Sequence, residues 1–174
     1  MQKKFSYPLK IEDLNQNEYK FDLNADKAEL EDIRDILKVE SVKYFNAEIY
    51  LKRHNRQNLL TVWGVVRTDL ELKSVISLNN FLRYYEVPFE MRFDTKATYK
   101  DIAEFGADID ADVPDIIENG EIDLADIALE QVALQLDDYP RAEGETFDYA
   151  KYCDFTDDEK ENPFAVLAKL KKWI

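Results

Sequence analysis

The sequence predicts an α+β fold: an antiparallel β-meander covered by an N-terminal helix, then an acidic linker and two C-terminal helices. Two runs between Leu59 and Phe93 alternate apolar and polar residues. This is the period of half-buried strands, whose successive side chains point to opposite faces. Segments before and after these runs repeat apolar residues at helical spacing. With 174 residues, 45% of them hydrophobic, the chain can bury one core, so a single domain over residues 1–174 is expected.

The predicted meander consists of three alternating runs with polar turns between them. The first has apolar residues at Ala47, Ile49 and Leu51, and the polar segment 53–58 supplies the turn that follows. The second and third runs each repeat apolar residues at every other position. These are Leu60, Val62, Val66, Leu70 and Leu72, then Phe81, Tyr85, Val87, Phe89, Met91 and Phe93. We therefore expect an antiparallel sheet with one buried face.

Before the meander, the chain offers two short strands and one helix. Residues 5–11 and 19–23 have strand-like composition and are expected at sheet edges. Asp26 and Glu29 have the spacing of a capping box, and apolar residues then recur at helical spacing. An amphipathic helix over about 27–38 should cover the apolar face of the sheet.

Behind the meander, residues 101–121 show no sustained period and are predicted to be an acidic linker between the β-rich residues 1–100 and a helical part at 122–174. Asp123 can cap a helix that continues to about Leu136. Asn162 and Pro163 have the form of a second helix start, whose stripe should dock through Phe164 and Trp173.

The charge of −14 is concentrated in one part of the chain. Residues 101–160 contain 20 acidic and 3 basic residues, whereas residues 1–100 contain 16 acidic and 17 basic residues. Such a segment repels phosphate and attracts basic partners. Its carboxylates are candidates for binding a basic protein. They include Asp108, Asp110, Asp112 and Asp115.

Compartment signals are few. One cysteine, Cys153, cannot form an internal disulfide, and the residues after Met1 lack the apolar region of a signal peptide. No apolar run approaches the roughly 20 residues of a membrane span. A cytoplasmic location and no contact with a membrane are expected.

The residue types that carry catalysis are scarce. His54 lies in a polar turn and Cys153 beside aromatic residues, so a solvated histidine and a buried thiol are expected. The acidic positions 108, 110 and 112 copy the start of a calcium loop, but Val113 and Asn119 stand where glycine and glutamate are needed. The sequence holds no zinc ligand set and no phosphate-binding loop. We expect no enzyme, no cofactor and no small-molecule substrate.

Aromatic and basic residues of the predicted strands suggest a surface for RNA. Exposed rings can stack on bases while neighbouring cations contact phosphates. No RNP consensus or GXXG loop accompanies them, and aromatic residues in strands usually serve packing. The candidate RNA contacts are Lys52, Arg53, Arg56, Trp63, Arg67, Arg83, Tyr84 and Arg92.

The segment IENGEIDLADIALEQVALQLDDYPR, followed by NPFAVLAKLK, resembles the YceD family, the large ribosomal RNA subunit accumulation proteins, in the form found in alphaproteobacteria. The resemblance covers most of residues 45–174. In that family a strand hairpin precedes an acidic stretch, a G-x-IDL-x-(D/E) segment, a helix ending in L-x-L and a proline turn. The corresponding positions are Gly120, Ile122, Asp123, Leu124, Asp126, Glu130, Gln131, Leu134, Leu136 and Pro140.

The hairpin corner departs from the family pattern. The family commonly has C-x-x-T-L or C-x-x-C-L there, and this chain has Ser74-Val75-Ile76-Ser77-Leu78. Because both cysteines are missing, no metal or redox role is carried over, and Ser74 and Ser77 are interpreted as turn residues.

The resemblance implies a bacterial ribosome-biogenesis factor that supports processing or accumulation of large-subunit (23S) rRNA, and it transfers no catalytic residues. Two modes of action remain open. The chain could bind precursor rRNA, a basic large-subunit ribosomal protein or both, or it could be an acidic module that caps a basic partner without meeting RNA. A metal-dependent nuclease using Asp108, Asp110 or Asp112 ranks third.

Overall fold

The computed structural model describes residues 5–54, 58–97, 114–117 and 119–148. It has a mostly antiparallel sheet and two α-helices, so the α+β class is confirmed. The chain divides into two units, residues 1–143 and 144–174. The first unit holds every helix and strand named below, and the described part of the second, residues 144–148, has neither.

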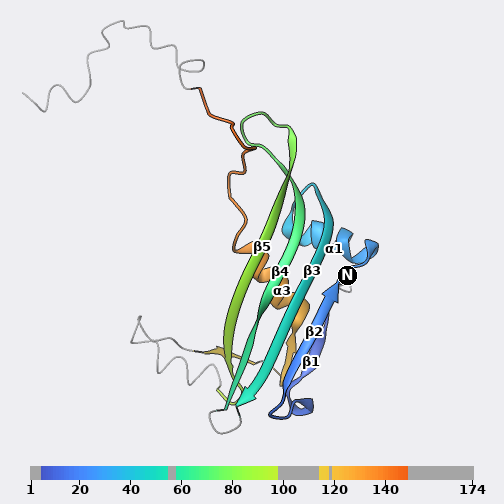
Figure 1. Ribbon diagram of the computed structural model, residues 1–174, viewed down its shortest axis with the longest axis vertical. Coiled ribbons are helices and arrows are strands. Elements are labelled where there is room, and N and C mark those ends of the chain that lie inside the picture. Colours follow the sequence, from blue (N-terminus) through green and yellow to red (C-terminus); the bar gives the residue numbers. More distant parts are fainter. Residues whose placement is uncertain (1–4, 55–57, 98–113, 118, 149–174) are drawn as a thin grey trace, which may run out of the picture. The chain divides into compact units, whose positions relative to one another are not determined.

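Five strands form the main sheet in the order β2-β3-β4-β5-β6. They are β2 (Glu18–Asn24), β3 (Ser41–His54), β4 (Leu59–Lys73), β5 (Asn80–Asp94) and β6 (Asp115–Ile116). Each of the first four pairs antiparallel with its neighbour along the chain, and β6 joins the edge of β5 in parallel. Figure 1 shows the long strands side by side, with the helices behind them.

Alternation along these strands separates a buried face from a solvated one, as the sequence predicts. The residues of β3 and β4 that were predicted to form the buried face, together with Val87, Phe89 and Phe93 of β5, are at most 9% exposed. Phe81, Tyr85 and Met91 are half-buried and pack against the same core. The apolar sets of the three runs therefore share one core.

α1 (Lys27–Leu37) begins with the predicted capping box. The Asp26 carboxylate accepts hydrogen bonds from two backbone N–H groups of the first turn, and the Glu29 carboxylate accepts one from the Asp26 N–H at 2.7 Å. Ile33 and Leu37 are buried, and the helix packs on β3. The capping box and the apolar stripe therefore both predict this helix.

α3 (Leu124–Ala133) starts at the predicted cap and ends three residues before the predicted end at Leu136. The Asp123 carboxylate accepts from the Ala125 N–H at 2.9 Å and also from the Tyr7 N–H at 2.8 Å. One side chain thus caps the helix and fixes the N-terminal segment. Leu134, the C-cap residue, is 70% exposed, so burial of its side chain does not favour a longer helix. Neither helix in the described ranges has the length and apolarity of a membrane span.

The ends of the fold differ from expectation. Only Pro8–Lys10 of the first predicted strand forms β1, which is followed by a 3-10 turn at Ile11–Asp13, and β1 pairs with β7 (Glu121–Asp123) rather than with the main sheet. Strands β6 and β7 also occupy part of the predicted linker 101–121, because the edges of β5 and β1 offer backbone groups for pairing. The predicted helix near Phe164 and Trp173 lies outside the described residues.

Gly64 sits at the centre of β4, opposite Ile49 and Phe89. A Cβ atom built there would lie 2.0 Å from the backbone oxygen of Glu48. The obstacle is backbone, which cannot rotate away as a side chain could. Only glycine lets β3 approach β4 this closely.

We expect Gly64→Ala to destabilise the fold by about 2–3 kcal/mol in urea unfolding, because the added methyl group must displace the β3 backbone. Without the contact, alanine would stabilise the strand by about 0.5–1 kcal/mol, so the sign of the change is informative. Val65→Ala, one residue along the same strand, serves as the control and should cost less. Equal or greater stability of Gly64→Ala would contradict the close approach.

Candidate functional site

The face of the main sheet opposite α1 and α3 is the candidate surface, and we call it the open face. Both helices contact the other face, and no helix of the described residues covers this one. Its side chains come from alternating positions of four strands. They include Lys20, Asp22, Tyr44, Glu48, Tyr50, Lys52, Trp63, Arg67, Asp69, Glu71, Leu82, Tyr84, Glu86, Glu90 and Arg92.

A stacked pair of rings lies in the middle of this face. Tyr50 and Trp63 are cross-strand partners, with ring centroids 5.8 Å apart and an interplanar angle of 14°. The Lys20 ammonium lies 5.7 Å from the centroid of the Tyr50 ring. Since the two rings already stack on each other, each has at most one free side for a base.

Four cations on or beside the open face contact carboxylates of this face. The pairs are Lys20 with Glu48 at 3.0 Å, Lys43 with Glu71 at 3.0 Å, Arg67 with Glu86 at 3.0 Å and Arg92 with Glu90 at 3.8 Å. Exposed pairs of this kind contribute little to stability. They do cancel local charge, so the open face carries no basic stripe of the kind that follows a phosphate backbone.

The titration of these groups reflects the pairing. The hydrogen bond from Lys20 lowers the pKa of the Glu48 carboxyl below its ordinary value, and the Tyr50 hydroxyl lowers it further. The same bond to Glu48 raises the pKa of Lys20. In the next pair, Ser41 and then Lys43 lower the pKa of Glu71. These carboxylates are charged and engaged near neutral pH.

The structure places the candidate RNA contacts on both sides of the sheet. Five of the eight lie on the open face: Lys52, Trp63, Arg67, Tyr84 and Arg92. Arg53 and Arg83 lie on the opposite side of the sheet, and Arg56 is outside the described residues. The seven described candidates therefore do not share one face of the sheet, and contact of any of them with RNA stays a prediction.

The two arginines on the opposite side contact other parts of the fold. Arg53 donates to the backbone oxygens of Ile11 and Leu14, at 2.9 and 3.1 Å. Arg83 pairs with Asp137 and donates to the backbone oxygen of Arg141 at 2.8 Å. The sequence could not reveal these uses because the acceptors lie about 40 and 55 residues away in the chain.

Of the candidate acidic contacts, only the last is described. Asp115 is exposed and lies in β6, beside Phe93 of β5. The positions 108, 110 and 112 fall outside the described residues. In the ranges that are described, no three His, Cys, Asp or Glu side chains gather as a metal site.

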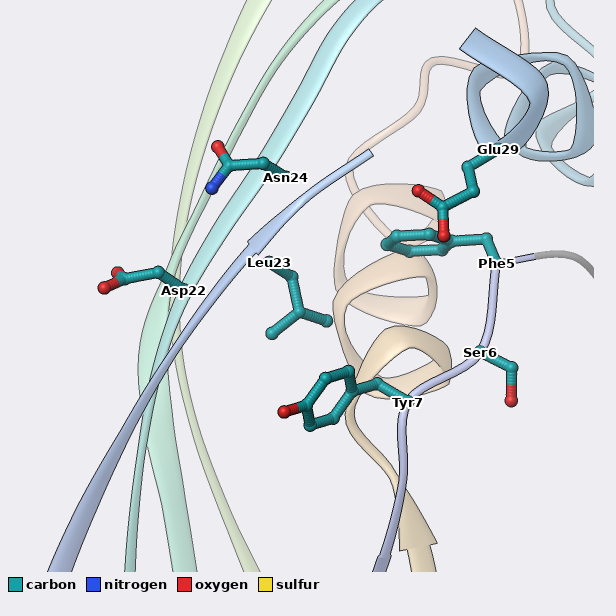
Figure 2. A pocket seen from close by; sticks show the side chains of 7 residues that line it. All are labelled: Phe5, Ser6, Tyr7, Asp22, Leu23, Asn24 and Glu29. Atoms are coloured by element: carbon teal, nitrogen blue, oxygen red, sulfur yellow. The ribbon is translucent and has the colours of Figure 1, made fainter. Parts of the chain in front are cut away.

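A pocket of about 210 Å³ opens between β2 and the N-terminal segment. Figure 2 shows Phe5, Tyr7 and Leu23 facing one another across it, while Asp22 points away on the far side of β2. The Glu29 carboxylate at its upper end is already engaged in the helix cap. The lining residues, which also include Ser6 and Asn24, suggest no reacting group, so the open face remains the better candidate.

The corner between β4 and β5 is closed by a buried serine. Ser74 is 1% exposed, and its Oγ accepts from the N–H groups of Ile76 and Ser77 at 3.1 and 3.3 Å. The Val75 N–H donates to the backbone oxygen of Pro140 at 2.9 Å. The hairpin corner and the turn after α3 therefore meet in space.

Comparison with known proteins identifies the family. A family model described as the large ribosomal RNA subunit accumulation protein YceD matches residues 62–171, more than half of the chain. The chain belongs to the YceD family. The family name connects it with the accumulation of large-subunit ribosomal RNA. No curated protein and no solved structure gives a significant match.

Most positions that carry the YceD resemblance have structural roles in packing, turns or contacts between elements. Gly120 has a φ of 71°, and Ile122 and Leu124 are buried. Gln131 donates from Nε2 to the Met91 sulfur at 3.4 Å, which ties α3 to β5. Glu130 is exposed and Leu136 half-buried. The motif therefore describes how α3 and its turn attach to the hairpin.

Ser74 and Ser77 occupy the family's cysteine positions and form the turn, as interpreted from the sequence. We expect Ser74→Ala to destabilise the protein by about 1–2 kcal/mol, because two N–H groups in the corner lose their acceptor. Ser77→Ala is the matched control, since its Oγ accepts one exposed bond from Asn79, and it should cost about 0.5 kcal/mol or less. Chemical denaturation measures both. Equal costs would show that the buried hydroxyl does not hold the corner.

Proposed function

We propose that this YceD-family chain is a non-enzymatic factor that supports accumulation of large-subunit (23S) rRNA by binding a basic large-subunit ribosomal protein. The observation that carries the proposal is the internal pairing of cations on the open face. A surface whose positive charges are already neutralised has little to offer a polyanion. The acidic balance of residues 101–160 favours a basic partner.

Direct contact with precursor rRNA is the second candidate. The Tyr50 and Trp63 stack and the exposed Tyr84 offer ring surfaces for bases, and Lys52 lies on the same face. Base stacking without phosphate contacts gives weak association, because the charge term supplies most of the affinity for nucleic acid. RNA contact therefore ranks behind binding of a basic protein.

Depletion of the protein is expected to lower large-subunit rRNA relative to small-subunit rRNA, because an unprotected or unassembled large-subunit precursor is lost. Quantification of the two rRNAs from depleted and complemented cells measures the ratio. A complemented strain with the wild-type chain should restore it. An unchanged ratio on depletion would count against the proposed function.

Capture of partners from a lysate, with and without RNase, separates the two modes of action. If the partner is a basic ribosomal protein held directly, its recovery should survive RNase treatment and fall as salt rises. Recovery that disappears with RNase would show that rRNA is the bridge and would favour the second candidate. Mass spectrometry of the captured proteins provides the measurement.

A further inference from the structure

One cross-strand row of the open face combines two exposed tyrosines with a carboxylate. Tyr44 of β3 and Tyr84 of β5 are the partners of Asp69 on either side of β4. The two tyrosines are 38% and 50% exposed. Neighbouring strands lie about 4.8 Å apart, so the backbones that carry the two tyrosines are about 10 Å from each other. Asp69 lies on the strand between them.

The backbone of β3 helps to form this row. The β3–β4 register shifts between Val42 and Tyr44, where an extra residue bulges out of the ladder. A bulge of this kind redirects the side chains beside it. Phe45 and Thr68, the next pair, are buried on the core side, so Tyr44 and Asp69 face the solvent.

The cations nearest to this row are engaged elsewhere. Lys43 contacts Glu71 and Arg67 contacts Glu86, each at 3.0 Å. Within the described residues, the Asp69 carboxylate makes no hydrogen bond or ion pair. Burial raises the pKa of the Tyr44 hydroxyl, and the charge of its cross-strand partner Asp69 adds to this rise.

A carboxylate between two exposed rings matches the chemistry of a basic side chain. The ring faces attract a cation and cover the aliphatic part of the side chain, and the carboxylate supplies the opposite charge. Leu82, 60% exposed in the neighbouring row, extends the apolar area beside it. A phosphate would meet repulsion from Asp69 in the same place.

We propose that Tyr44, Asp69 and Tyr84 form a slot that binds a lysine or arginine side chain of a basic protein partner. The inference rests on the proposed function and gives the partner a docking position on the open face. It is independent of the acidic positions 108, 110 and 112. The slot gives the open face a role in recognition of a protein rather than of RNA.

The test uses the full chain and a synthetic peptide with alternating glycine, lysine and arginine, titrated by calorimetry. We expect Asp69→Asn to weaken binding about fivefold and Tyr84→Thr about threefold. The matched control is Glu90→Gln, which removes the same charge from the same face far along β5 and should change the affinity less than about 1.5-fold. Resonances of the Tyr44 and Tyr84 rings should shift with the peptide.

An equal loss in Asp69→Asn and Glu90→Gln would overturn the slot, because it would show diffuse attraction to a negative protein. Equally strong binding of spermidine would overturn the assignment to a protein partner. Because Tyr84 is exposed, Tyr84→Thr tests the slot even if Asp69→Asn is unstable. If wild type captures a basic ribosomal protein after RNase and Asp69→Asn captures as much, the slot fails while the proposed function stands.

Discussion

The ladder between β4 and β5 is the interaction on which the rest of the structure depends. It pairs Leu59–Lys73 with Asn80–Asp94 without a register shift, and β3 continues the same alternation on the other side of β4. A slip of one residue would move every core side chain of a strand to the solvent. The ladder thus fixes both the apolar face that α1 and α3 cover and the polar face that they leave open.

The open face is in contact with solvent, and many of its charged side chains form ion pairs with one another. Lys20 with Glu48 and Arg67 with Glu86 are typical of these contacts. The charge of Lys20, Lys43, Arg67 and Arg92 is therefore offset by neighbouring carboxylates. Tyr84 is 50% exposed beside the half-buried Asp69, and we propose that this combination suits a basic side chain better than a phosphate.

Local patterns in the sequence were sufficient for β2 to β5 and both described helices, but not for the short strands β1, β6 and β7. Runs with a period of two predicted the core residues of the strands. Asp26 and Asp123 predicted the helix starts, because a capping signal spans only about four residues. Long-range contacts were not accessible in this way. Neither the contact between Val75 and Pro140 nor the use of Arg53 by the turn at Ile11 leaves a local signal, so sequence reasoning assigned that arginine to the wrong face.

The central claim is that the open face does not bind RNA through charge. Filter binding of purified chain to labelled 23S rRNA, over a series of salt concentrations, tests it most directly. At about 0.15 M salt the account predicts association no tighter than about 10⁻⁵ M, the range of weak non-specific binding. Association near 10⁻⁸ M that weakens steeply with salt would contradict it.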